Sequence, residues 1–153
     1  MSAVAIILSS CGSDACSIHY SGSDCSIQDT PTSILIKSIT INSYPTSDGG
    51  GSWDTFPTSG PDIFLKILDD QGAELHETGY YTDLAGVNYS DIGLTLNPNQ
   101  TIQIVGYDYD EFSGNDYMGG VMASIYSPVG GFPENKDMSY GDWSFTVELQ
   151  YNW

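Results

Sequence analysis

The stretch that decides the fold is IQIVGYDYDEFSGNDYMGGVMASIY, residues 102–126, in which two apolar runs flank a short acidic loop. The first run alternates β-branched and polar residues, and the second is apolar and contains glycines. This pattern predicts two β-strands joined by the loop. The loop carries Asp108, Asp110 and Asp116 in the spacing D-x-D-x5-D, and no Lys or Arg stands near them in the sequence.

Carboxylates this close together require a positive counter-charge, because without one they repel each other or take up protons. Ca²⁺ suits such a loop, since it binds roughly six to eight hard oxygen ligands in flexible geometry. The loop is not an EF-hand, because counting from Asp108 puts Ser113 where the invariant glycine belongs and Gly119 where the final Glu belongs. The spacing therefore indicates calcium on a loop between strands.

Short strand patterns recur along the rest of the chain, separated by turn-forming stretches at intervals of about ten residues. The expected strands cover residues 33–44, 62–68, 74–81, 91–96, 101–107, 117–126 and 143–153. Without a convincing amphipathic helix, these seven or eight short strands predict an all-β fold, an antiparallel β-sandwich of the eight-stranded type. Loops of a sandwich gather at its two ends, and the loops with concentrated aspartate are 45–61 and 107–117.

The acidic loop and its flanking strands resemble the third calcium-binding loop of C2 domains, as found in synaptotagmin and protein kinase C. The family pattern is an apolar strand, D-x-D, a further Asp, an apolar pair, a glycine and a return strand. Asp108, Asp110 and Asp116 match its acidic positions, and YMG (117–119) follows them. The resemblance covers roughly residues 33–130 and implies a C2-like fold.

The resemblance also implies calcium ligands on a first loop. The family has an Asp that opens a strand of the type D-P-Y-V-K-V, and PDIFLKI matches this strand from Asp62. The partner on the same loop is Asp54 in SWDTF, although the gap is longer than is common in the family, and Asp48 is a rival. The implied cofactor is Ca²⁺, and the implied ligands are Asp54, Asp62, Asp108, Asp110 and Asp116.

C2 domains occur in two strand topologies, and the strands at the two ends of the domain distinguish them. A type II-like topology has residues 33–44 as the opening strand and residues 143–151 as the closing one. A type I topology would need a further strand upstream, in the cysteine-bearing segment. That segment is rich in Ser, Gly and Asp, which favours the type II-like arrangement.

Three aromatic residues of the aspartate-rich loops, Trp53, Phe56 and Phe112, are candidates for contact with lipid or with a partner. Two interpretations stay open for Trp53 and Phe56, which either form loop tips or pack over the base of the loop. Glu111 stands where many membrane-binding C2 domains carry a basic residue, and it would repel anionic headgroups. Phospholipid binding is therefore a weaker expectation than calcium binding.

The charge of the chain excludes some partners. The 153 residues contain 20 Asp and Glu against three Lys and no Arg, and the formal net charge is −17. Phosphate binding needs clustered Lys and Arg, so a nucleic-acid partner is excluded. Unaided binding to an anionic membrane is disfavoured for the same reason, whereas a metal cation complements the charge. A solvated acidic surface is the alternative reading of this composition.

The first residues, MSAVAIILSSC, resemble the end of a bacterial lipoprotein signal peptide, in which LSSC is the lipobox and Cys11 becomes the acylated residue. The alternative is a buried first strand. The lipoprotein reading divides the chain into a signal-peptide remnant (1–10), a Ser/Gly-rich tether (11–31) and the C2-like domain (32–153). It implies a lipid-anchored protein of the bacterial outer membrane, periplasm or cell surface.

Cysteine counting agrees with export. When Cys11 carries lipid, Cys16 and Cys25 remain as an even pair, and an exported protein would oxidise them to a disulfide. His19 lies between them, but these residues lack the paired spacing of a zinc motif.

Catalytic motifs are missing from the sequence, which contains no G-x-S-x-G, P-loop or H-E-x-x-H. We therefore expect a non-enzymatic calcium-binding module of a cell-envelope lipoprotein, with phospholipid headgroups or an envelope protein as its partner. The alternative is a structural subunit of an envelope or surface complex in which calcium is a stabilising staple, and an enzyme of unknown type is the third class.

Overall fold

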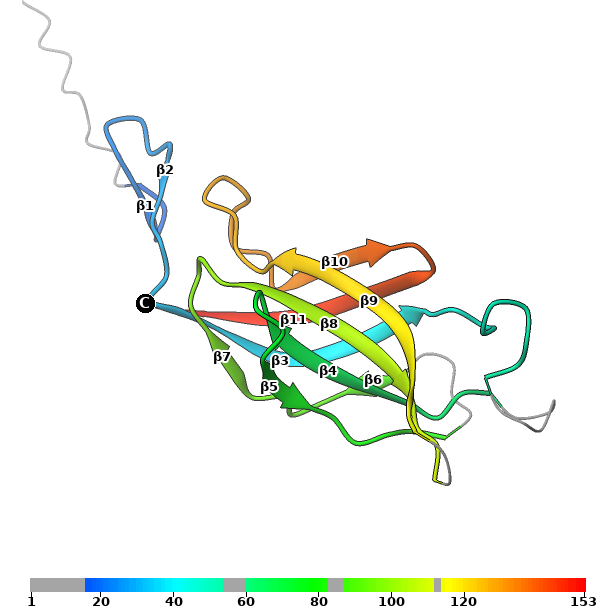
Figure 1. Ribbon diagram of the computed structural model, residues 1–153. Helices are drawn as coiled ribbons and strands as arrows, with labels where there is room; N and C mark the ends of the chain where they lie inside the picture. Colours follow the sequence, from blue (N-terminus) through cyan, green and yellow to red (C-terminus); the bar gives the residue numbers. More distant parts are fainter. Residues whose placement is uncertain (1–15, 54–59, 83–86, 112–113) are drawn as a thin grey trace, which may run out of the picture.

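The computed structural model describes residues 16–53, 60–82, 87–111 and 114–153, and every regular element in them is a β-strand (Figure 1). The strands are β1 (Tyr20–Ser21), β2 (Ile27–Gln28), β3 (Ser33–Ser43), β4 (Ile63–Asp69), β5 (Glu74–Glu77), β6 (Asn88–Tyr89), β7 (Leu94–Leu96), β8 (Thr101–Asp108), β9 (Asp116–Ser124), β10 (Asn135–Tyr140) and β11 (Trp143–Asn152). Within the same residues, no helix is long and apolar enough to cross a membrane.

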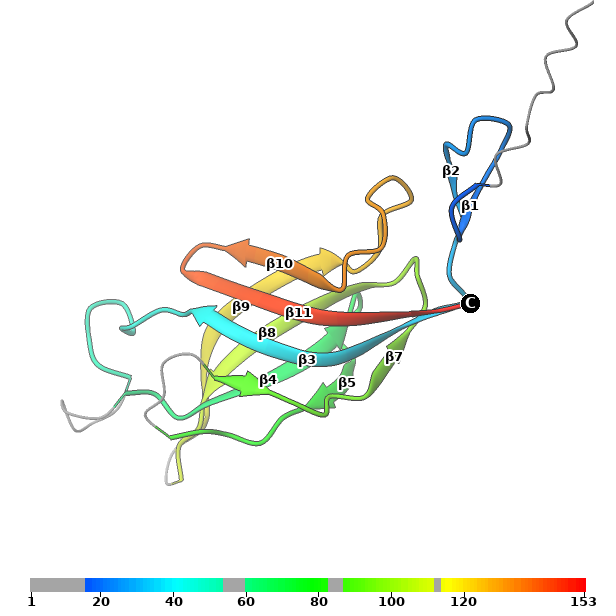
Figure 2. The same ribbon diagram turned by 180° about the vertical axis from the view of Figure 1, so that it is seen from behind.

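Strands β3 to β11 form two facing sheets (Figures 1 and 2). One sheet has the order β10-β11-β3-β6, with β7 also paired to β3, and the other has the order β5-β4-β8-β9. All pairs are antiparallel, which confirms the predicted all-β sandwich. Strand β3 opens the sandwich and β11 closes it beside β3, as expected for the type II-like topology.

Strand β3 keeps four isoleucines in the core although their spacing is not a strict alternation. Ile34, Ile36, Ile39 and Ile41 are each at most 1% exposed. The step from Ile36 to Ile39 is one residue longer than the two-residue period of a strand, and the register with β11 shifts at this point. The bulge therefore takes up Lys37 and returns the later isoleucines to the buried face.

The sandwich contains nine strands in the described residues, and not eight. The strand expected at residues 91–96 is shortened to β7, and β6 lies before it, where no strand was expected; both pair with β3. Between them Asp91 and Gly93 have φ values of 61° and 63°, a left-handed conformation that interrupts a strand. A further strand, β10, lies in residues 135–140, where no strand was expected.

Trp143 ties the two sheets together near the acidic end of the molecule. Its ring is 3% exposed, and its Nε1 donates a hydrogen bond to the carbonyl of Met118 (2.9 Å). The ring lies against Gly106 of β8, where an added Cβ would be 2.2 Å from ring atom Cη2. Gly106 lies in the sheet of β8 and has no side chain, so it leaves room for the indole ring of Trp143, which reaches across from β11 in the opposite sheet.

The segment before the sandwich has more structure than its Ser/Gly-rich composition predicts. Strands β1 and β2 form a hairpin, and a disulfide joins Cys16 to Cys25. This is the pairing that the cysteine count favours. The predicted lipidation residue Cys11 and the remnant 1–10 lie outside the described residues.

The hairpin docks on the end of the sandwich where β11 finishes. The His19 ring stacks on Trp153 at a centroid distance of 3.4 Å. Gln28 donates from Nε2 to the Ser127 carbonyl (3.0 Å), and its Oε1 accepts from the amide of Gly131 (2.7 Å). The described part of the expected tether is therefore attached to the domain by specific contacts.

Candidate metal centre

Strand β4 begins and strand β8 ends at the end of the sandwich opposite the hairpin (Figure 1), and a hydrogen bond joins Asp62 to Asp108 there. Strand β4 begins at Ile63, whose register partner is Asp108, the last residue of β8. The amide of Asp62 donates to Oδ1 of Asp108 (2.7 Å), and the amide of Tyr109 donates to the Asp62 carbonyl (2.9 Å). The two predicted aspartate-rich loops, far apart in sequence, are thus joined where their strands pair.

Asp108 is the most enclosed acidic residue of this end. It has no exposed surface, and it is the only buried acidic or basic residue among those described. Burial of a carboxylate disfavours its ionised form unless donors or cations surround it. A hard cation bound by oxygen ligands is a group of that kind, so the donor chemistry of this residue fits calcium.

The lysines of the chain are engaged at other places. Lys37 forms an ion pair with Glu148, and Lys66 binds the carboxylates of Glu74 (2.8 Å) and Glu77 (2.7 Å). These hydrogen bonds to Glu74 and Glu77 raise the pKa of Lys66. The outer face of β4 therefore lacks the basic patch that would attract anionic headgroups.

The remaining predicted ligands of the third loop lie close in the chain but are more accessible. Asp116 is the register partner of Asp108 across β8 and β9, and it is exposed. Asp110 is half-buried, and its amide donates to the Oδ1 of Asn115 (3.2 Å), which closes the described part of the loop. Asp110 and Asp116 therefore stand near Asp108 along the chain and in the strand register.

The metal-ligand geometry of this end is incomplete in the described residues. Across them, no three His, Cys, Asp or Glu residues are grouped closely enough to hold a metal ion. The predicted ligand Asp54 lies outside the described residues, as do Phe56 and Phe112. Asp48, the rival of Asp54, is exposed in a tight turn in which its amide and carbonyl both bond to Gly51.

Trp53, one of the three candidate loop tips, packs at the base of the first loop. Its ring is partly buried against the core, and its Nε1 donates to the carbonyl of Pro45 (2.8 Å). This placement corresponds to the packing interpretation that the sequence left open.

Two tyrosine contacts at this end were missed by the sequence analysis. The rings of Tyr80 and Tyr109 stack at a centroid distance of 4.2 Å, which joins the segment after β5 to the acidic loop. Tyr89 donates its hydroxyl to the Ile63 carbonyl (2.6 Å) beside Asp62, and burial raises the pKa of Tyr89. Neither contact has a local sequence signal, because each joins segments that only the fold brings together.

Comparison with known proteins identifies the fold. The sequence matches no known protein family and no curated protein. Among solved structures it is similar to a C2 domain, with 16% identity, a TM-score of 0.53, and coverage of 78% of this chain and 96% of that one. A C2 domain of plant extended synaptotagmin 1 is similar at 15% identity and a TM-score of 0.53, with 82% and 97% covered.

Human GIVD cytosolic phospholipase A2 is also similar, at 14% identity and a TM-score of 0.56, but this chain matches only 17% of its length while 81% of this chain is covered. At these identities the likeness concerns the fold alone. The chain therefore has the β-sandwich fold of a C2 domain.

Proposed function

We propose that this chain is a non-enzymatic calcium-binding C2-like module of a cell-envelope lipoprotein, with calcium held between its two aspartate-rich loops. The observation that carries the proposal is the junction of Asp62 with the buried Asp108 at one end of a C2-like sandwich. That junction is where the D-x-D loop and the loop before β4 come together.

Calcium would be held by Asp62, Asp108, Asp110 and Asp116, with Asp54 supplying a further carboxylate. Bound calcium supplies the positive charge that these side chains otherwise lack, and it removes the repulsion between them. Because the ligands come together only in the folded chain, binding stabilises the native state. Extracellular modules of this kind bind at about 10⁻⁴ to 10⁻³ M, which suffices where calcium is plentiful.

The partner of the calcium-loaded end is a phospholipid headgroup or an envelope protein. The ion pairs of Lys66 with two glutamates and the exposed Glu111 both oppose an anionic bilayer. These observations favour the second candidate function, a structural subunit of an envelope or surface complex in which calcium is a stabilising staple. An anchor at Cys11 would place the protein at the bacterial outer membrane, periplasm or cell surface.

Calorimetry with calcium tests the proposal on the wild type and on Asp110→Asn. We expect a binding heat and a raised melting temperature for the wild type, and a weakening of both in the variant. Asp70→Asn is the matched control, because it removes the same charge from an exposed turn just after the other end of β4. The absence of any heat at millimolar calcium in the wild type contradicts the proposal.

Liposome pelleting then separates the two candidate functions. Calcium-dependent pelleting with anionic vesicles supports a lipid-binding module. If no lipid composition gives such pelleting, lipid binding is excluded and the structural subunit stabilised by calcium remains. The same assay on Asp110→Asn shows whether any pelleting depends on the acidic loop.

A further inference from the structure

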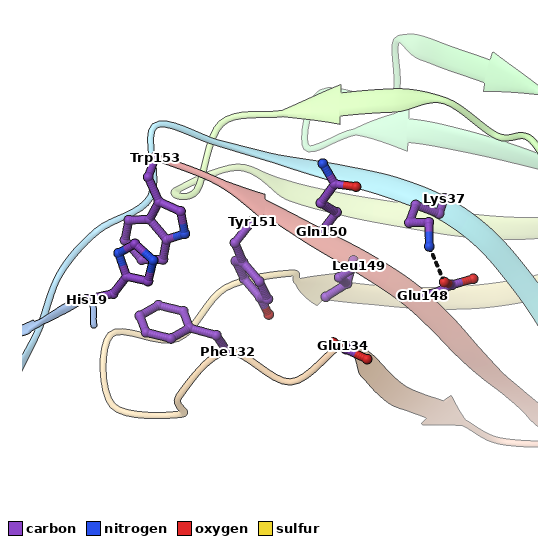
Figure 3. Close-up of a pocket in the computed structure, with 9 residues that line it drawn as sticks. All are labelled: His19, Lys37, Phe132, Glu134, Glu148, Leu149, Gln150, Tyr151 and Trp153. Atoms are coloured by element: carbon purple, nitrogen blue, oxygen red, sulfur yellow. Dashed lines mark hydrogen bonds and ion pairs between the residues drawn. The ribbon is translucent and has the colours of Figure 1, made fainter. Parts of the chain in front are cut away.

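A groove of about 330 Å³ lies on the five-stranded sheet beside the docked hairpin (Figure 3). Three segments that are distant in sequence form it: the hairpin at His19, the loop before β10 at Phe132 and Glu134, and the last residues of β11. Lys37 of β3 completes its far side. The docked hairpin therefore supplies one wall of the groove, and the sandwich supplies the rest.

One end of the groove is aromatic. Trp153 carries the His19 ring on one side, and the Phe132 ring meets Trp153 edge-on at a centroid distance of 4.9 Å. Tyr151 contacts Phe132 at 5.4 Å and extends the cluster along the strand (Figure 3). Trp153 remains 45% exposed, so this cluster presents aromatic surface to a ligand in the groove.

The other end of the groove is charged, with an excess of negative charge. Glu148 binds Lys37 and also accepts from the hydroxyl of Ser38 (2.9 Å). The hydrogen bond to Glu148 raises the pKa of Lys37, and the same contact lowers the pKa of Glu148, so both are charged near neutral pH. Glu134 faces the groove from the loop side, and its carboxylate has no hydrogen bond or ion pair with any described residue.

The net charge of the groove favours a positively charged ligand. With Lys37 and Glu148 compensating each other, Glu134 leaves a net negative charge in the groove of a chain whose formal charge is −17. Anionic ligands are repelled, and cations are concentrated at such a surface. Among biological cations, the guanidinium group is planar, stacks on aromatic faces and pairs with carboxylates, which are the two kinds of surface present here.

We propose that this groove binds the arginine side chain of a basic partner segment, with the guanidinium group between the aromatic cluster and the carboxylate of Glu134. This interaction uses no calcium and no residue of the acidic end, so it goes beyond the proposed function. A net charge of −17 also accelerates the approach of a basic partner at low salt.

NMR titration of the full chain tests the proposal with a capped peptide that contains one arginine between glycines. The matched ligand carries citrulline in place of arginine, which keeps the shape of the side chain and removes its charge. We expect the arginine peptide to shift the Trp153 indole resonance and the amide of Glu134, and the citrulline peptide to bind at least about fivefold more weakly. Raising NaCl from about 0.05 M to about 0.5 M weakens the arginine complex.

Protein variants distinguish the groove from the general acidity of the molecule. Glu134→Gln should weaken the arginine peptide by about threefold to fivefold, and Trp153→Ala by a similar factor. Asp137→Asn is the matched control, because Asp137 is an exposed carboxylate of β10 that is bonded to Thr146, and it should bind as the wild type does.

Three results overturn the proposal. Equal affinity for the citrulline peptide shows a neutral hydrogen-bonding site, such as one for a saccharide. Equal weakening by Glu134→Gln and Asp137→Asn shows attraction to overall charge only, and absence of shifts at the groove with millimolar peptide shows no site. Because the carboxylate of Glu134 bonds to no described residue, folding of Glu134→Gln is expected to be normal.

Discussion

Replacing Gly106 with alanine tests how the two sheets pack beside the acidic end. The added Cβ would lie 2.2 and 2.3 Å from two atoms of the Trp143 ring, far inside van der Waals contact. The ring has no room to retreat, since it is 3% exposed and is held by the bond from Nε1 to the Met118 carbonyl. Either the ring or strand β8 must shift.

Overpacking of this kind costs about 1–3 kcal/mol of the free energy of unfolding. For a domain of this size the loss lowers the melting temperature by roughly 4–12 °C. Urea unfolding followed by circular dichroism measures it. Gly79→Ala is the matched control, because an added Cβ there meets nothing within 4 Å, and its effect should stay within about 0.5 kcal/mol.

The cause is isolated by repeating Gly106→Ala in a Trp143→Phe background. A smaller ring leaves space for the methyl group, so the cost of the alanine should fall by about 0.5–3 kcal/mol relative to its cost in the wild type. An equal cost in both backgrounds, or a neutral effect in the wild type, refutes the reasoning. Gly106 lies two residues before Asp108 in β8. If the alanine displaces strand β8 and not the Trp143 ring, Gly106→Ala should therefore also weaken calcium binding.

Three further changes probe other parts of the molecule. Replacing Cys16 and Cys25 with serine should remove about 2–3 kcal/mol of local stability from the hairpin, seen as lost hydrogen-exchange protection there while the urea midpoint of the sandwich changes little. Glu148→Gln should be less stable than the wild type at neutral pH. The lowered pKa of Glu148 means that its contribution is present above the ordinary value of 4.5 and is lost as the pH falls through the folded value, so the two urea midpoints should converge in acid. Tyr89→Phe should cost about 0.5–1.5 kcal/mol in urea unfolding, at the lower end because the Ile63 carbonyl keeps a backbone donor.

The sequence was informative where the relevant signal is local. Near-alternation in β3 and β8 and the turn residues between strands predicted the sandwich, because each strand turns mainly one face to the core and its pattern follows largely from that face. The junction of Asp62 with the D-x-D loop was expected only through the resemblance to C2 domains. Chemistry alone indicated carboxylates in need of a cation, and it did not indicate which distant segment would supply the others.

The missed features are those whose stability comes from distant contacts. Strand β10 (Asn135–Tyr140) buries only Met138, so its sequence has no strand alternation, and its pairing with β11 decides its conformation. The hairpin reads as a tether because its Ser/Gly-rich sequence buries little. Its order depends on the disulfide and on ring contacts with Trp153, a residue more than a hundred positions away.

The docked hairpin constrains how an anchored molecule would meet a membrane. The chain enters the sandwich at one end, where the amide of Thr32 bonds to the Asn152 carbonyl (2.8 Å), and strand β8, which finishes at Asp108, ends at the other (Figures 1 and 2). The eleven residues of β3 that run toward the acidic end extend about 36 Å at the rise of a strand.

Under the proposed anchor at Cys11, the five residue-to-residue steps from Cys11 to Cys16 span at most about 18 Å. A tether this short holds the hairpin end close to the bilayer, so the acidic end cannot turn to insert head-on into the membrane that carries the anchor. The calcium-loaded end would then meet a partner beside or beyond that membrane, which is the geometry of an envelope complex more than that of a lipid-inserting module.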